Sequence, residues 1–122
     1  EAAYVHAEGY AAGEMKHGPI ALIDKNFPTI AIAVKNNETY EKTLSNLEEI
    51  KSRGGPILAI ASEGDKQITK LTDDVFYIPA GSAIIEPLLA VIPLQLFAYY
   101  FGVLLGYDVD KPRNLAKSVT VE

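Results

Sequence analysis

The chain has 122 residues, a formal net charge of −5 and no cysteine. Its hydrophobic content of 48% is sufficient for the core of one domain. The negative charge argues against nucleic acid or an anionic membrane surface as a partner. Without cysteine there are no disulfides, thiolate nucleophiles or cysteine-ligated metals, which is consistent with the cytoplasmic location that we expect.

The first half of the chain predicts a buried strand followed by an amphipathic helix. Residues Val5–Ala12 fit either a short strand or an irregular segment, and a brief helix is expected at Pro19–Ile23. Pro28–Val34 is an apolar run rich in β-branched residues, typical of a central parallel strand. Asn36 and Asn37 offer turn and helix-capping chemistry. The apolar face of the following helix is Tyr40, Leu44, Leu47 and Ile50, and Gly54-Gly55 ends it.

The second half predicts two more strands and a long apolar helix. The strands are Ile57–Ala61 and Val75–Ile78, with a weak short helix at Asp65–Leu71 between them. Ile84–Leu105 is long enough to span a membrane, but its polar residues and prolines favour a buried helix of an α/β domain. We expect the prolines to divide it into an entry turn and a main helix beginning near Pro93.

This alternation of strands and helices predicts an α/β fold with an open, doubly wound parallel sheet and helices on both faces. From Tyr107 onward the apolar periodicity ends, so residues 107–122 are expected to form an irregular tail without a face to bury. We therefore expect this tail to be ordered only by contacts with a neighbouring chain.

Ligands of such sheets bind at the carboxyl ends of the strands, here the loops beginning near Asn36, Ser62 and Ala80. None of these loops contains a dinucleotide fingerprint or a phosphate-binding P-loop, and no cofactor is expected. His6 and Glu8 could share a strand face, but a lone pair of this kind is a weak indication of metal, and no metal site is expected. His17 precedes Gly-Pro in a loop and could transfer a proton at neutral pH, although its position alone favours a structural role.

Three segments resemble the glucosamine-6-phosphate synthase family. Asp108–Glu122 reads DVDKPRNLAKSVTVE, which is similar to the terminal signature of that family. Tyr4–Asp24 contains HAEGYAAGEMKHGPIALI, similar to a second family segment, and Pro93–Tyr99 (PLQLFAY) matches a third. The resemblance covers the whole chain, although Phe27–Ala83 is only loosely similar.

The resemblance implies a domain organisation. The family has a glutaminase domain followed by two sugar-isomerase (SIS) domains of flavodoxin-like fold. Residues 1–106 would be the greater part of the second SIS domain, with its first strand and helix upstream, and residues 107–122 a catalytic tail. The family pattern also makes Val5–Ala12 a strand of the sheet. The chain alone would lack the ammonia source and most of the phosphate site, so we expect it to be inactive by itself.

The resemblance also implies three catalytic residues for the conversion of fructose 6-phosphate and glutamine into glucosamine 6-phosphate. Glu1 matches the base that moves a proton between C1 and C2 of the open-chain sugar. His17 matches a histidine that assists ring opening from the neighbouring subunit of a homodimer. Lys117 matches the tail lysine that forms an imine with the sugar carbonyl.

Two other functions fit the same fold. One is an SIS module that binds a phosphosugar as a regulator, without catalysis. The other is a dimerisation module in which Tyr99, Tyr100 and Phe101 lie at the interface. A module that only binds has no need of a lysine delivered on the tail segment Arg-Asn-Leu-Ala-Lys, which favours the enzyme.

Overall fold

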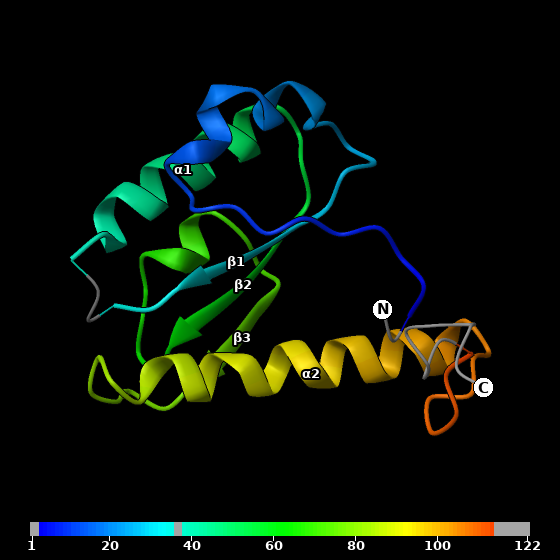
Figure 1. The fold of residues 1–122 in the computed structure, drawn as a ribbon. Coiled ribbons are helices and arrows are strands. Elements are labelled where there is room, and N and C mark those ends of the chain that lie inside the picture. The colour runs from blue at the N-terminus through cyan, green and yellow to red at the C-terminus, as the bar shows by residue number, and fades with distance from the viewer. Residues whose placement is uncertain (1–2, 36–37, 114–122) are drawn as a thin grey trace. The chain divides into compact units, whose positions relative to one another are not determined.

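The computed structural model describes residues 3–35 and 38–113, and the chain divides into two compact units. We call Glu8–Pro93 the sheet unit, and Glu1–Ala7 together with Leu94–Glu122 the tail unit. Figure 1 shows the elements in chain order. They are η1 (Glu14–His17), η2 (Pro19–Leu22), β1 (Thr29–Ala33), α1 (Tyr40–Ser52), β2 (Ile57–Ser62), η3 (Ile68–Lys70), β3 (Val75–Ile78) and α2 (Glu86–Leu104), where η marks a 3₁₀ helix.

The three strands form a parallel sheet in the order β1-β2-β3. Ala31 pairs with Ala59, and Ala61 pairs with Tyr77, so the carboxyl ends of neighbouring strands lie at one edge. Each strand has the apolar, β-branched composition expected of a buried parallel strand. The predicted α/β fold with a parallel sheet is therefore confirmed.

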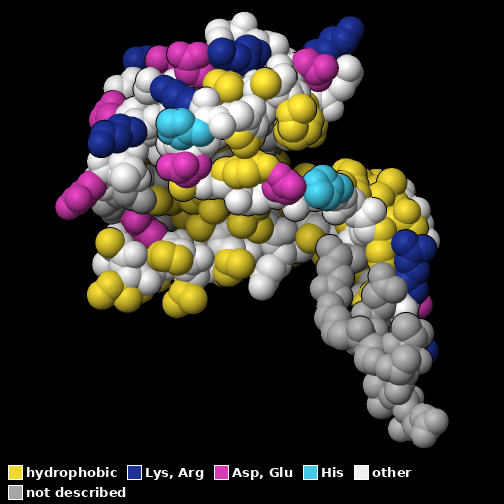
Figure 2. Space-filling view, turned by 45° about the horizontal axis from the view of Figure 1, so that its top comes forward, with side chains coloured by type: hydrophobic (Ala, Val, Ile, Leu, Met, Phe, Trp, Pro, Cys, Tyr) yellow, Lys and Arg dark blue, Asp and Glu magenta, His cyan; other side chains and the backbone are white. Residues whose placement is uncertain are grey.

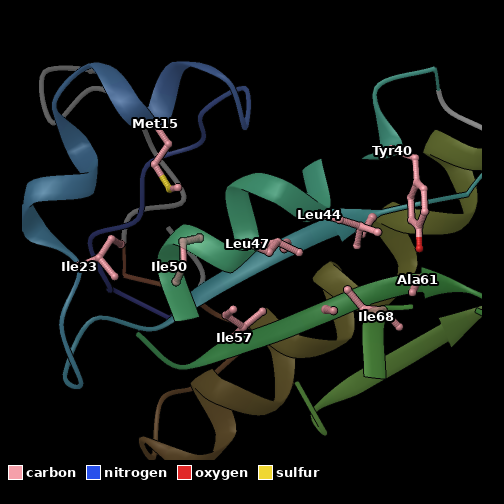
Figure 3. Packing of buried hydrophobic residues seen from close by; sticks show 12 residues of the cluster. Met15, Ile23, Tyr40, Leu44, Leu47, Ile50, Ile57, Ala61 and Ile68 are labelled. Carbon is pink, nitrogen blue, oxygen red and sulfur yellow. The ribbon is translucent and has the colours of Figure 1, made fainter. Parts of the chain in front are cut away.

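The core lies between α1 and one face of the sheet (Figure 3). Side chains alternate between the two faces of a strand, and the alanines and Ile57 point towards the helix. Small residues on the strands let the helix approach closely, and its own large side chains fill the space. The helix contributes Tyr40, Leu44, Leu47 and Ile50, which are the residues that the periodicity predicted. Burial of each such side chain contributes about 1.5–3 kcal/mol to stability.

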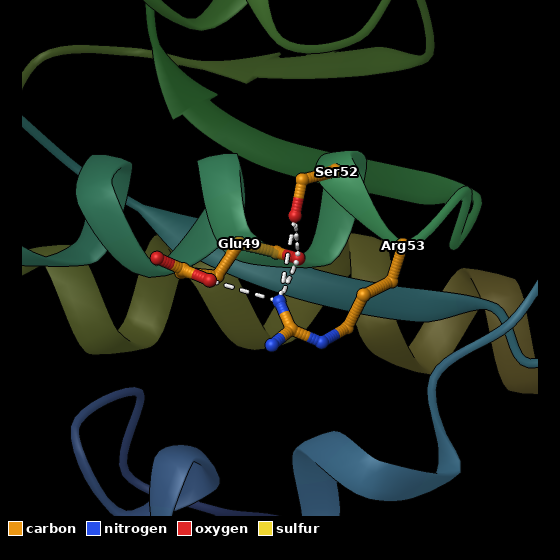
Figure 4. A network of polar contacts seen from close by, with 3 residues as sticks. All are labelled: Glu49, Ser52 and Arg53. Atoms are coloured by element: carbon orange, nitrogen blue, oxygen red, sulfur yellow. Dashed lines mark hydrogen bonds and ion pairs between the residues drawn. The ribbon is translucent and has the colours of Figure 1, made fainter.

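The end of α1 is set by Gly54 and Gly55. The N–H of Gly54 bonds to the carbonyl of Lys51, and the N–H of Gly55 bonds to that of Ile50, which is a Schellman motif. Gly54 has φ of +75°, a backbone conformation that glycine adopts without strain. On the exposed side of the last turns, Arg53 forms a 2.8 Å ion pair with Glu49, and this lowers the pKa of Glu49 (Figure 4).

One sequence prediction about local structure was wrong. Residues 5–12 form no strand, and apart from Ala12 their side chains are exposed, so this small-residue segment has no sheet neighbour among the described residues. The weak short helix expected at Asp65–Leu71 is present as the single turn η3. The brief helix expected at Pro19–Ile23 is present as η2. Asn36 and Asn37 lie outside the described residues, and the N-cap position of α1 is Thr39.

The long apolar helix also differs from its prediction. It is continuous from Glu86 to Leu104, with Pro93 inside it, rather than starting near Pro93. Pro87 is tolerated because the N–H groups of the first helical turn have no partner within the helix. Most of the helix surface is exposed rather than buried, and among the described helices it alone has the length and composition of a membrane span.

Candidate functional site

Of the three predicted catalytic residues, the described part of the chain includes only His17. Glu1 and Lys117 lie outside the described residues. His17 is the exposed last residue of η1. Figure 2 shows histidine side chains, coloured cyan, on the molecular surface. Gly18, with φ of +151°, follows His17 and is the N-cap of η2, which begins at Pro19. The local chain thus holds the imidazole at a solvent-accessible turn between two short helices, where proton transfer is possible.

Within the sheet unit, two of the predicted ligand loops meet at the carboxyl edge of the sheet. The backbone N–H of Lys35, just after β1, donates to Ser62 Oγ at 3.0 Å, and Ser62 is the last residue of β2. The N–H of Glu63 donates to the carbonyl of Ile78 at the end of β3. The three strand ends are therefore connected by hydrogen bonds at the edge where parallel sheets bind ligands.

A buried polar pair holds the loop that follows β2. The hydroxyl of Tyr40 donates to Asp65 Oδ2 at 2.6 Å, and both side chains are almost wholly buried. Asp65 Oδ1 accepts the backbone N–H of Gln67 at 2.8 Å and that of Ile68 at 3.4 Å. Burial of the Tyr40 hydroxyl raises its pKa well above the ordinary value. The hydrogen bond to Asp65 and the negative charge of Asp65 raise this pKa further. This pair keeps the loop rigid, and its neutral phenol is not suited to proton transfer near pH 7.

A second polar cluster lies in the tail unit. The hydroxyl of Tyr4 accepts the backbone N–H of Arg113 at 2.7 Å, and the Arg113 guanidinium lies 4.1 Å from the centre of the Tyr4 ring. The ring of Tyr107 meets the same ring edge-on, with centroids 4.8 Å apart. The expectation that the tail has no partner in its own chain is therefore wrong for residues 107–113.

The described residues hold no group of three or more histidine, aspartate or glutamate side chains that could bind a metal ion. An open depression of about 360 Å³ lies at the opposite, amino edge of β2, between Lys51 and Asp74. Ligands of parallel sheets bind at the carboxyl edge, so this depression is a poor candidate for the site.

Comparison with known proteins identifies the fold family. The SIS domain family matches residues 1–105, which include the sheet and α2. The chain belongs to the SIS domain family. In solved structures, this SIS domain is similar to the C-terminal domain of glucosamine-fructose-6-phosphate aminotransferase from Francisella tularensis, with a TM-score of 0.78 and 40% identity. That match covers 89% of this chain and 30% of the other.

Curated relatives extend the similarity beyond the SIS domain. Glutamine–fructose-6-phosphate aminotransferase [isomerizing] of Chlorobaculum tepidum is 63% identical over all 122 residues, and that of Thermus thermophilus is 58% identical. The corresponding enzyme of Aquifex aeolicus is 55% identical. The chain spans 20% of the length of these relatives. Because α2 lies within the family match, it is an element of the SIS domain, and its apolar composition is weak evidence for a membrane span.

Sequence reasoning missed the two polar clusters. Asp65 precedes Gln67 and Ile68, a spacing at which aspartate often accepts backbone N–H groups, so this turn had a local signal. The pairing of Tyr4 with Arg113 had none, because the two residues are 109 positions apart.

Proposed function

We propose that this SIS domain is the C-terminal part of an enzyme that converts fructose 6-phosphate and glutamine into glucosamine 6-phosphate and glutamate. The observation that carries the proposal is the extent of the similarity. The SIS family match ends at residue 105, whereas the named aminotransferases align with the whole chain, up to 63% identical. Residues 106–122 are therefore shared with these enzymes in particular, which disfavours a module that only binds a phosphosugar.

The proposed roles follow from the chemistry that each side chain allows. The Nζ of Lys117, when unprotonated, attacks C2 of the open-chain ketose, and loss of water gives an imine. The carboxylate of Glu1 moves a proton between C1 and C2, since isomerisation of a ketose requires a base beside the exchanging hydrogen. His17 assists opening of the sugar ring, consistent with its exposed position after η1.

The same proposal includes partners and location. Ammonia comes from a glutaminase domain, and the sugar phosphate is bound mainly by a first SIS domain of the same polypeptide. The protein is a cytoplasmic homodimer in which His17 acts on the site of the neighbouring subunit. The half-exposed Tyr99 and Tyr100 on α2 supply apolar surface of the kind that such an interface requires.

Because those domains supply ammonia and phosphate binding, residues 1–122 alone should give no glucosamine 6-phosphate from fructose 6-phosphate and glutamine. Formation of sugar product by the purified chain would contradict the proposal that other domains supply the ammonia and bind the sugar phosphate.

The test of the proposed catalytic role is Lys117→Ala in the full-length protein, with sugar product and glutamate release followed separately. We expect sugar product to be abolished while glutamine hydrolysis is largely kept, since the amine acts only on the sugar carbonyl. Formation of sugar product at a near wild-type rate would show that Lys117 has no catalytic role.

A further inference from the structure

The Tyr4 cluster joins the two ends of the tail unit through one side chain. The Tyr4 hydroxyl accepts a hydrogen bond, and a guanidinium lies over the face of the Tyr4 ring. A second aromatic ring packs against the Tyr4 ring at an angle of 84°. Two of these contacts come from Arg113 and the third from Tyr107. Only tyrosine combines a hydroxyl acceptor with a ring that both a cation and an aromatic edge can contact.

Tyr4 is also the only described residue other than glycine with a positive φ, which is +51°. This left-handed conformation is uncommon for a bulky side chain and persists only where the surrounding contacts impose it. The bond from Arg113 and the packing of Tyr107 are contacts of Tyr4 that can do so. The backbone at Tyr4 and the position of the tail segment are therefore linked.

The cluster lies between two residues of the proposed catalytic set. Glu1 is three positions before Tyr4, and Lys117 is four positions after Arg113. Four residues of fully extended chain span at most roughly 14 Å. When Arg113 is fixed on Tyr4, the four intervening residues limit how far the lysine can move from the anchored segment.

We propose that Tyr4 is a positioning residue that holds the tail by Arg113, so that Glu1 and Lys117 act on the same sugar. This inference rests on the proposed function. Tyr4 does not touch the reacting atoms; it raises the effective concentration of the amine at the carbonyl by removing freedom from the segment that precedes it.

The experiment compares four variants in the full-length enzyme. Tyr4→Leu removes the ring and the acceptor, Tyr4→Phe removes only the acceptor, and Arg113→Lys keeps the charge but loses the planar guanidinium. Lys111→Ala is the matched control, because it removes a positive charge from the same segment, and the Lys111 side chain makes no hydrogen bond or ion pair with another described residue. Each variant is assayed for kcat and KM of sugar formation, for glutamate release, and for hydrogen exchange of the amides of residues 107–113.

We expect Tyr4→Leu to lower kcat for sugar formation roughly tenfold or more, and Tyr4→Phe roughly fivefold, from the contacts removed. The KM for fructose 6-phosphate and the rate of glutamate release should change little, and the amides of 107–113 should exchange faster. Arg113→Lys keeps the backbone N–H that bonds to Tyr4 and keeps a positive charge, so its loss of kcat should be smaller than that of Tyr4→Leu, and Lys111→Ala should match wild type.

Faster exchange with an unchanged kcat in both Tyr4 variants would overturn the positioning role, even if Lys117→Ala still abolishes sugar product. An equal loss of kcat and glutamate release would also overturn it, because it would indicate general damage to the enzyme. If Lys117→Ala itself leaves sugar formation intact, the proposed function fails, and unchanged exchange in Tyr4→Leu would then separately refute the contact.

Discussion

Replacing Asp65 by alanine removes the acceptor for three donors at the carboxyl edge of the sheet. The Tyr40 hydroxyl loses a 2.6 Å bond inside the core, and the N–H groups of Gln67 and Ile68 lose theirs in the loop. Water can reach the partly exposed N–H of Gln67, but the hydroxyl of Tyr40 is buried and stays without a partner. We therefore expect the free energy of unfolding to fall by about 3–5 kcal/mol.

Tyr40→Phe keeps the packing of the ring and the two N–H donors to Asp65, and removes only the hydroxyl. A hydrogen bond to a charged group contributes about 1.5–3 kcal/mol, so this single change should cost that amount. In the double variant the carboxylate and the hydroxyl are both absent, so neither is left without the other, and only the N–H groups of Gln67 and Ile68 still lack their acceptor. The cost of the double change should be smaller than the sum of the two single costs by about 1.5–3 kcal/mol.

Urea denaturation of the wild type, both single variants and the double variant measures this coupling. Tyr77→Phe is the matched control, because its hydroxyl makes only a 3.3 Å bond to the carbonyl of Asp65, and it should cost less than about 1 kcal/mol. Additivity of the Tyr40 and Asp65 changes to within about 0.5 kcal/mol would show that the pair does not interact as the structure indicates.

Gly55→Ala should destabilise the chain by about 1–3 kcal/mol, because a Cβ there would lie 2.6 Å from Ile23 Cγ2 and 2.8 Å from Ile50 Cγ2. Gly13→Ala, where φ is −67° and nothing lies within 4 Å, should be neutral or stabilising, and equal effects in thermal melts would be inconsistent with the packing described. The raised pKa of Tyr40 gives a contribution to stability that is constant below about pH 10 and falls above it, since the unfolded chain loses this proton first. Tyr40→Phe should reduce the slope of unfolding free energy above pH 10 by about 1.4 kcal/mol per pH unit, and an unchanged slope would contradict the assignment.

The sheet and its covering helix were predictable because their signals are local. Val75–Ile78 and the run ending at Val34 are apolar and β-branched, and the spacing from Tyr40 to Ile50 repeats along one helix face. The glycine pair after α1 likewise ends the helix where expected. In each case neighbouring residues alone determine the structure.

The errors have the opposite origin. Whether Val5–Ala12 pairs as a strand depends on neighbours elsewhere in the chain, and its own small residues contain no such information. The continuity of α2 through Pro93 shows that one missing N–H does not end a long helix. The contact of Tyr4 with Arg113 links positions 109 apart, which no local pattern can reveal. The catalytic assignments of Glu1 and Lys117, outside the described residues, depend on the family resemblance and remain predictions.

The most direct test of the central claim is reduction of the full-length enzyme with borohydride in the presence of fructose 6-phosphate, followed by peptide mass spectrometry. If Lys117 forms an imine with C2 of the sugar, hydride reduces that bond and leaves the sugar covalently attached to the Nζ of Lys117 as a secondary amine. The account predicts one modified peptide, the one containing Lys117, and its absence from Lys117→Ala or when the sugar is omitted. An active enzyme in which Lys117 stays unmodified, or in which another lysine is labelled instead, would contradict the account.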